Sequence, residues 1–208
     1  MNIILLDKEN VKEINDIEVI EDTKLYIVNL DSNYKVNINL LDNTKLEVFD
    51  FNLSNKSVEF VINQNNNTSF IYNHSFKING DYNLNMVANI LGNDNTNKIN
   101  IYGISNGDAK LIVDGFVKNG TKNNILDENI KVLTIDGKCF TRPMMHINVK
   151  ECIANHNTAI SNVRDDEVFY LMSKGLDKDT SIKLISDGYL YGLFKNEEEF
   201  YNKIDKEG

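Results

Sequence analysis

The side chains that could do chemistry in this chain are few and lie far apart. They are two cysteines, three histidines and a run of carboxylates, namely Cys139, Cys152, His74, His146, His156, Asp165, Asp166 and Glu167. None falls in a CxxC, HExxH, GxSxG or phosphate-loop pattern. The sequence therefore predicts no self-contained metal, hydrolase or nucleotide site, which argues against a stand-alone enzyme.

Two interpretations are open for the thiols and the last imidazole. Cys139 and Cys152 can each be a small buried hydrophobe on a strand, kept reduced in a reducing compartment. A soft thiolate can instead hold iron or sulfide transiently, if a partner completes the ligand set. His156 can form a local hydrogen bond as the chain leaves the last strand. We expect His74 and His146 to be ordinary surface or strand residues.

Short capped helices are predicted from residue 165 onward. Acidic residues 165–167 suit the positive end of a helix dipole, and Gly175 can end that helix. Asp177 is the expected N-cap of a second helix that stops at residues 187–188, and a third begins near Asn196. The apolar faces of these helices are formed by Val168, Phe169, Leu171 and Met172, then Ile182, Leu184 and Ile185, then Phe200, Tyr201 and Ile204.

Upstream of the helices, runs rich in Val, Ile, Tyr and Phe alternate with clusters of Asn, Asp and Gly. This pattern predicts a mainly β body, either a sandwich or a solenoid of stacked coils. Asn favours the solenoid slightly, because it tolerates left-handed turns and can stack in ladders. An AT-rich genome would also enrich Asn. The predicted strands are residues 24–29, 34–40, 45–51, 57–62, 68–72, 84–90, 98–102, 109–114, 131–135 and 145–149.

Length and charge bound the class of protein. A chain of 208 residues suits one domain, or a body with a small appendage. The net charge of -9 argues against nucleic acid and anionic membranes as partners, since both need a basic surface. The first residues, MNIILLDKEN, resemble neither a secretory signal nor a membrane span. We therefore expect a cytoplasmic protein.

Residues 156–189 resemble the C-terminal core of the SufB/SufD family of iron–sulfur cluster assembly proteins. The family pattern is His-[Gly/Glu]-Ala-Thr, then acidic residues, then Leu-Phe-Tyr-Leu-x-Ser-Arg-Gly-Ile. This chain has His156-Asn157-Thr158-Ala159, then DDEVFYLMSKGL from Asp165. The next helix also matches, with Leu184-Ile185-x-x-Gly188-Tyr189, and so do Asp108-Ala109-Lys110, Asp114-Gly115 and the LTIDGKCFTRP run of residues 133–143. The resemblance covers residues 108–189; the family's N-terminal helical region has no counterpart, as in a short form.

The resemblance implies a right-handed parallel β-helix (solenoid) over residues 1–160 and a small C-terminal α-helical subdomain over residues 161–208. It also implies a scaffold subunit that dimerises through its β-helix, with a strand edge within residues 127–141 as the expected contact. The helices would dock the ABC-type ATPase SufC, whose ATP-driven closure would twist the dimer. The docking candidates are Phe169, Tyr170, Leu171, Leu184, Ile185 and Tyr189.

The site residues of the family separate SufD from SufB. Asn157 replaces the SufB glutamate, and the SufB cysteine maps near Asn129, so the chain resembles SufD. His156 is retained, and the resemblance implies that it is an iron ligand, with Cys139 and Cys152 as further candidates for handling a transient iron–sulfur cluster. No tightly bound cofactor is expected. The β-helix partner is a SufB-type subunit or a second copy.

Three other classes of protein fit the sequence less well. A β-helix carbohydrate enzyme would need clustered carboxylates and aromatics in a cleft, whereas the acids here are scattered and Trp is absent. A structural or adhesive β-solenoid leaves the helical tail without a role. A homodimeric SufB-like scaffold would need the two ligands that Asn129 and Asn157 replace.

Overall fold

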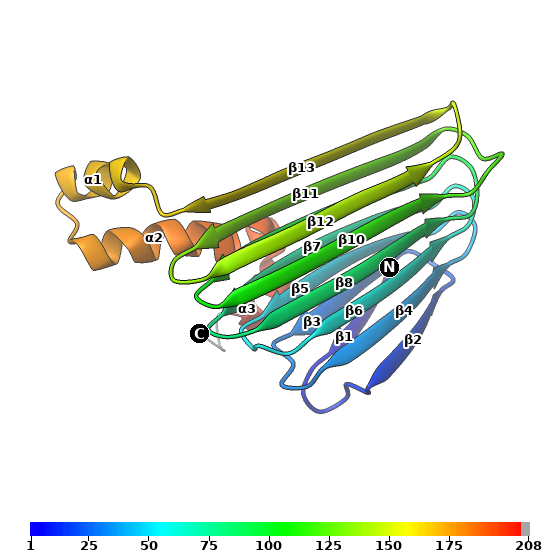
Figure 1. Ribbon diagram of the computed structural model, residues 1–208. Helices are drawn as coiled ribbons and strands as arrows, with labels where there is room; N and C mark the ends of the chain where they lie inside the picture. The colour runs from blue at the N-terminus through cyan, green and yellow to red at the C-terminus, as the bar shows by residue number, and fades with distance from the viewer. Residues whose placement is uncertain (205–208) are drawn as a thin grey trace.

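The body of the molecule consists of two stacked parallel sheets (Figure 1). The structure is a computed structural model that describes residues 1–204. One sheet holds β1 (Asn2–Leu6), β3 (Thr23–Val28), β5 (Lys45–Asn52), β7 (Ser69–Ile78), β9 (Thr96–Ser105), β11 (Asn124–Thr134) and β13 (Cys152–Asn162). The other holds β2 (Ile14–Val19), β4 (Tyr34–Leu40), β6 (Val58–Gln64), β8 (Tyr82–Ile90), β10 (Asp108–Val117) and β12 (Lys138–Ile147).

Successive strands alternate between the two sheets, so the chain winds as a β-solenoid. This confirms the predicted parallel solenoid and excludes the sandwich, whose strands would be antiparallel. The coils lengthen along the chain: Ile14 pairs with Lys35, 21 residues on, whereas Asp108 pairs with Lys138, 30 residues on. The unequal coil length explains why no repeat is visible in the sequence.

The core fills the space between the two sheets. Side chains alternate along each strand, so every second residue faces inward. In β8, for example, Tyr82, Leu84, Met86, Ala88 and Ile90 are buried while the residues between them are more exposed. Most inward residues of both sheets form one hydrophobic cluster that extends from Leu6 to Val132, and Ile90, Val117 and Leu126 form a smaller one. Burial of each such side chain contributes roughly 1.5–3 kcal/mol to the stability of the folded state. These contributions add up because the coils stack along the solenoid axis.

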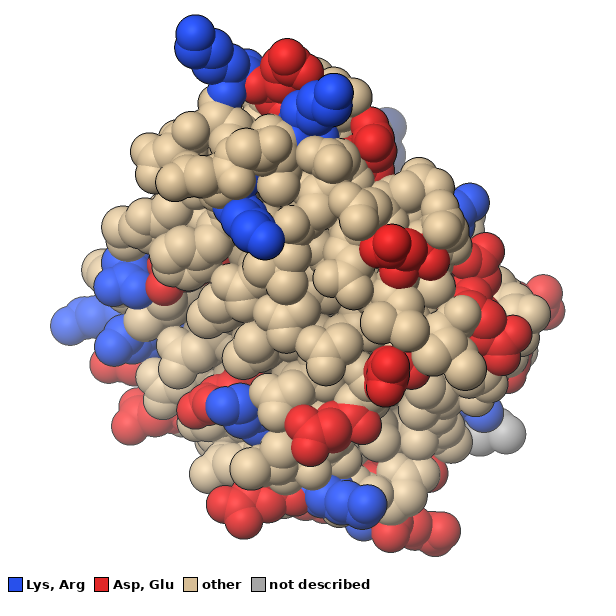
Figure 2. Space-filling view, turned by 90° about the vertical axis from the view of Figure 1, so that its right-hand side faces the viewer, with Lys and Arg blue, Asp and Glu red and all other residues tan. Residues whose placement is uncertain are grey.

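Asparagine stabilises the turns that join the second sheet to the first. Asn43, Asn67, Asp94 and Asn123 have positive φ angles of 64°, 53°, 59° and 57°. Asn67 donates from Nδ2 to Oδ1 of Asn43 at 2.8 Å, and Asn123 donates to Asp94 at 2.9 Å. Figure 2 shows this end of the molecule, where charges of both signs are scattered over a mostly uncharged surface. The abundant Asn therefore has the ladder role that the sequence suggested.

Several predicted strand limits were wrong. The strand expected at residues 131–135 is the end of β11, and the strand expected at residues 145–149 is the end of β12. Three strands were missed: β1, β2 and β13. The missed strands lie at the two ends of the solenoid. Their inward side chains are covered on one side only, and this leaves the apolar alternation weaker.

Four helical segments follow β13: α1 (Asp165–Ser173), α2 (Lys178–Tyr191), the 3-10 helix η1 (Gly192–Phe194) and α3 (Glu198–Ile204). The predicted caps of the first two helices are confirmed: Asp177 accepts a hydrogen bond from the Thr180 amide, and Gly175 has φ +97°. Asn196 does not cap α3, because that helix begins at Glu198. The predicted end of α2 at residues 187–188 was wrong, because the helix continues to Tyr191. Its last turn places Leu190 in a buried cluster, and this packing outweighs the helix-breaking tendency of Gly188.

The helices divide into a packed part and a projecting part (Figure 1). Leu190, Phe194, Phe200 and Ile204 pack on aromatic side chains of the first sheet, such as Phe49. In contrast, α1 extends beyond the sheets and buries only Val168, mainly against α2. The predicted helical subdomain is thus anchored at its C-terminal side; its last four residues lie outside the described residues. No described helix has the length and apolar character needed to cross a bilayer.

Candidate functional site

The last coil of the solenoid is open. Among residues 1–204, β12 pairs only with β10 and β13 pairs only with β11, so both leave a free strand edge. Ile160 on β13 is 43% exposed, whereas its register partner Val132 on β11 is fully buried. The described chain therefore ends its solenoid with uncovered inward-facing side chains and unpaired backbone groups. Such an edge readily pairs with another chain.

The predicted cluster-handling residues lie on this coil but are not brought together. Cys139 is near the start of β12, Cys152 starts β13, and His156 is exposed in the middle of β13. Four residues of extended strand separate Cys152 from His156, about 13 Å. Burial raises the pKa of the Cys139 thiol to about 11 and also raises that of Cys152. Both cysteines are therefore protonated at neutral pH and are weak ligands as they stand.

A carboxylate that sequence reasoning missed lies directly beside His156. Glu128 on β11 is the register partner of His156 and is 1% exposed. Its side chain crosses the interior toward β10, where Gly115 leaves room: a Cβ there would lie 3.5 Å from Oε1. Burial, followed by the charge of Asp114, raises the pKa of Glu128 to about 8. Its Oε2 atom is buried without a hydrogen-bond partner in the described chain.

The alternation of β11 would have revealed this residue. Leu126, Ile130 and Val132 are its apolar inward positions, and Glu128 takes the place between them. Asn129, where the resemblance placed the SufB cysteine, is on the outer face and donates toward the Tyr102 hydroxyl at 3.4 Å. The interior position on this coil thus carries a carboxylate.

Only part of residues 127–141, where we expected the edge that pairs with a partner, lies on a strand edge. β11 is an interior strand, paired with both β9 and β13, so residues 127–134 have no free edge. Residues 138–141 do lie on an edge, because they start β12. On the outer face of this strand Phe140 is 56% exposed, and Arg142 forms an ion pair with Asp114 at 3.1 Å. Among the described strands, the free edges at this end of the solenoid are β12 and β13, and those at the other end are β1 and β2.

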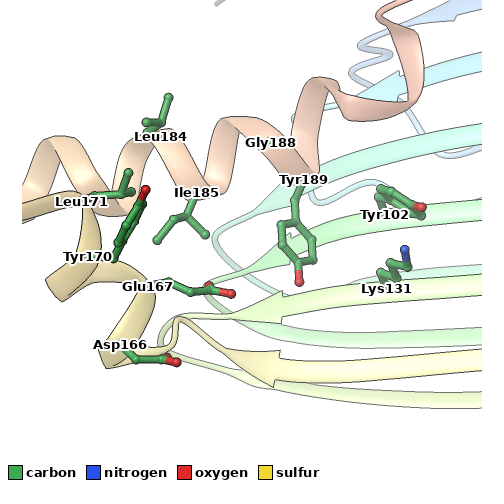
Figure 3. Close-up of a pocket in the computed structure, with 10 residues that line it drawn as sticks. All are labelled: Tyr102, Lys131, Asp166, Glu167, Tyr170, Leu171, Leu184, Ile185, Gly188 and Tyr189. Atoms are coloured by element: carbon green, nitrogen blue, oxygen red, sulfur yellow. The ribbon is translucent and has the colours of Figure 1, made fainter. Parts of the chain in front are cut away.

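A second candidate site is a groove of about 640 Å³ between the helices and the first sheet. Figure 3 shows Tyr170 and Leu171 from α1 and Ile185 and Tyr189 from α2 around it. Lys131 lies at the sheet end of the groove, with its ammonium 4.9 Å from the Tyr102 ring. The acidic residues Asp166 and Glu167 line the opposite end.

The groove gathers most of the residues predicted to dock a partner. Tyr170, Leu171, Leu184, Ile185 and Tyr189 line it, whereas Phe169 does not. Tyr170 is 60% exposed and Leu184 is 52% exposed. Outside the groove on the same helix, Phe169 is 74% exposed and Met172 is 43% exposed. A projecting pair of helices with this much uncovered apolar surface is typical of a protein–protein contact.

His74 is a strand residue, as predicted, but the polar cluster around it was not foreseen. Its Nδ1 lies 3.1 Å from Oδ2 of the buried Asp50, and its Nε2 lies 2.9 Å from the Tyr82 hydroxyl. Tyr34 and Tyr72 donate to the same carboxylate at 3.1 and 2.8 Å. Burial raises the pKa of all three tyrosines well above the usual value, which keeps them as donors. The cluster is sealed in the core, which indicates a structural role.

His146 lies on the outer face of the second sheet. Its ring stacks on Phe116 of the neighbouring strand, with ring centroids 4.3 Å apart. No group of three or more His, Cys, Asp or Glu side chains within residues 1–204 is placed to hold a metal ion. Any metal at the open end would therefore need ligands from outside this chain or from water.

Comparison with known proteins gives one family match. The family model described as "SUF system FeS cluster assembly, SufBD core domain" matches residues 34–189. The match begins with β4 and ends in α2, so it includes the open coil and the groove. No curated protein matches the chain.

Proposed function

Because the chain belongs to the SufBD core-domain family of iron–sulfur cluster assembly proteins, we propose that it is a SufD-like scaffold subunit of the assembly complex. In this role the chain carries out no catalysis of its own. Its open coil binds a second β-solenoid subunit, and its helices dock an ABC-type ATPase of the SUF system. A transient iron–sulfur cluster is the cargo of the complex.

The observation that carries the docking proposal is the groove between α1, α2 and the first sheet. Five of the six predicted docking side chains line it, and two of these, Tyr170 and Leu184, are more than half exposed. Exposed aromatic and aliphatic anchors grouped in a concavity are typical of interface hot spots. The packed half of the helical segment would transmit a pull on α1 and α2 to the solenoid, since Leu190 and Phe194 are buried against its sheet.

The open coil supports the dimerisation proposal. The free edges of β12 and β13 can continue each sheet into a partner, and Ile160 would lose its exposed apolar surface there. The SufD-like assignment rests on Asn157, which stands where SufB has a glutamate, and on Glu128 and Asn129, neither of which is the cysteine that SufB has near this position. A SufB-type subunit is accordingly the proposed partner, and it would supply the thiolate.

Closure of the ATPase dimer supplies the energy in this scheme. Two ATPase subunits that approach each other on binding ATP would carry the two helical segments with them. The solenoids would then rotate at their common edge and open the space around the last coil. The chain itself needs no nucleotide site for this action.

A binding assay between the purified chain and the SUF-system ABC ATPase from the same genome tests the docking proposal. We expect the wild-type chain to bind the ATPase, and Tyr170→Asp or Leu184→Asp to weaken binding by about 30-fold or more, as expected for loss of an interface anchor. Ile20→Asp is the matched control, because Ile20 is 71% exposed but lies after β2, away from the groove. Equal binding by all four proteins would exclude the groove as the docking site.

A further inference from the structure

We propose that copies of this chain associate head to tail, with the first coil of one copy on the last coil of the next. The first coil comprises residues 1–22, with β1 and β2, and the last coil comprises residues 138–162, with β12 and β13. The two coils form opposite ends of the solenoid (Figure 1). The inference goes beyond the function proposed above, and a SufB-type subunit and a second copy would compete for the last coil.

The first coil is uncovered in the same way as the last one. Among the described strands, β1 pairs only with β3 and β2 pairs only with β4, so each leaves a free edge. A cavity of about 440 Å³ at this end is lined by residues of both strands, including Ile4, Leu6 and Ile17. These side chains point into the coil, because they continue the buried rows of the second coil. A terminal coil of this kind needs a cover, which the described residues do not supply.

The charges of the two ends are opposite. Residues 1–22 contain seven carboxylates and two lysines, whereas residues 138–162 contain three Lys or Arg side chains, two histidines and one carboxylate. On β2 the exposed outward positions include Asp16 and Glu18. On β12 they include Lys138, Arg142 and His146. Complementary charges of this kind favour contact between unlike ends and oppose contact between like ends.

The register of the second sheet specifies how such a contact would align. Successive strand pairs connect Val19 of β2, coil by coil, with Ile147 of β12. A copy that continues this column would pair its Val19 with Ile147, and this places its Glu18 beside His146, on strands about 4.8 Å apart. In the first sheet the equivalent column leads from β1 to β13, so β1 would add to that edge at the same time.

The direction of the strands also favours the head-to-tail order over a symmetric dimer of last coils. Every strand pair in the two sheets is parallel, and a copy stacked head to tail adds further parallel strands. A symmetric contact would instead bring Arg142 and His146 of both copies to one surface. Because the first and last coils are different surfaces, the head-to-tail contact does not close on itself and produces open-ended rods.

Sedimentation velocity of the purified full chain at increasing concentration tests the association. We expect the average mass to pass that of two 23.8 kDa chains without reaching a plateau. The mass should fall when NaCl is raised from about 0.05 to 0.5 M, because salt screens exposed charges. A symmetric dimer would instead stop at two chains.

Charge reversal at the two facing positions tests the register. Glu18→Lys and His146→Glu should each weaken association by about tenfold or more, because each brings like charges together in the contact. The double variant should regain most of this loss; a double variant as weak as the single ones would contradict the pairing of Glu18 with His146. Glu59→Lys is the matched control and should associate as the wild type does, since Glu59 is an exposed carboxylate on β6, in the middle of the same sheet.

Three results would overturn the proposal: a wild-type chain that stays monomeric at every concentration its solubility allows, a plateau at two chains that Glu18→Lys leaves unchanged, or equal losses with Glu18→Lys and Glu59→Lys. Circular dichroism checks that each variant is folded. Capture of the ATPase by Glu18→Lys should match the wild type, since Glu18 lies on the second sheet and the groove on the first. Failure of the wild type to capture the ATPase would refute the docking function and leave the sedimentation result independent.

Discussion

The carboxylate of Glu197 and the ammonium of Lys24, 173 residues apart in the chain, form an ion pair at 2.5 Å. The Tyr26 hydroxyl donates to the other oxygen of Glu197 at 2.7 Å. Both charged side chains are largely shielded, with 18% and 14% of their surface exposed. The contact fastens the start of α3 to the second strand of the first sheet. The helical segment is therefore anchored to the early coils although it leaves the solenoid at the last one.

Replacement of Glu197 by Gln should loosen this anchor. The change leaves the Lys24 ammonium without its partner and weakens a charge-assisted bond, which we expect to lower the free energy of unfolding by about 1.5–3 kcal/mol. Chemical denaturation measures the loss, and hydrogen exchange should show faster exchange in α3. Glu198→Gln is the control, since Glu198 is the next acidic residue and forms no ion pair within residues 1–204. Equal effects of the two changes would contradict the anchoring role.

The same contact predicts a pH dependence. Burial raises the pKa of Glu197, but hydrogen bonds from Lys24 and Tyr26 lower it more. The pKa of Glu197 therefore lies below its usual value of 4.5. The folded state therefore binds the Glu197 proton less tightly than the unfolded state, and the stabilisation is present above about pH 4.5 and lost as the pH falls through the folded pKa. The stability difference between wild type and Glu197→Gln should be constant from pH 6 to 8 and shrink toward pH 3. A difference that grows in acid would contradict this.

Asp50 should be the most sensitive polar residue of the core. Asp50→Ala removes the acceptor of Tyr34 and Tyr72 and the neighbour of His74, and leaves buried polar groups unpaired. We expect a loss of about 3–5 kcal/mol in the free energy of unfolding. Tyr72→Phe removes only one donor and should cost about 1 kcal/mol. Urea denaturation of the two variants checks the ranking; a milder effect for Asp50→Ala would contradict the account of the cluster.

Substitutions of Asn67 can separate two contributions to stability: its hydrogen bond to Asn43 on the neighbouring coil and its left-handed backbone conformation. Asn67→Ala removes the hydrogen bond to Asn43 and places a residue without local hydrogen bonding at a φ of 53°. The left-handed conformation should cost about 1–2 kcal/mol for Ala. Asn67→Gly loses the same side-chain bond but accepts the backbone conformation. Thermal unfolding should therefore rank wild type above Gly and Gly above Ala; an Ala variant as stable as the Gly variant would show that the conformation matters little.

The solenoid was predictable where each coil carries its own apolar pattern. β4 has Tyr34, Val36, Ile38 and Leu40 at alternate positions, and its predicted limits were correct. β13 was missed because its sequence, CIANHNTAISN, lies at the open end and has few large apolar side chains. The lengthening coils also removed the fixed period that would have aligned one coil with the next. Strand limits near the ends thus depend on pairing more than on composition.

The candidate sites also differ in how far the sequence alone could predict them. The shared face of the side chains that we propose for docking on α1 and α2 was predictable, because local helix spacing determines which side chains lie together. The Asp50–His74 contact depends on the register between β5 and β7, and no local pattern contains that register. Glu128 lies between these cases: its inward direction follows from the alternation of β11, but its proximity to His156 follows only from the pairing with β13. Contacts across coils need the structure.

The scaffold account is tested most directly by the mass of the complex formed between the purified chain and the SUF-system ATPase, measured by light scattering during size-exclusion chromatography. The account predicts a complex with one ATPase per wild-type chain. When the Tyr170→Asp variant is used in place of the wild-type chain, the variant and the ATPase should elute separately. Separate elution of the wild-type chain and the ATPase at tens of micromolar, with both proteins folded, would contradict the account.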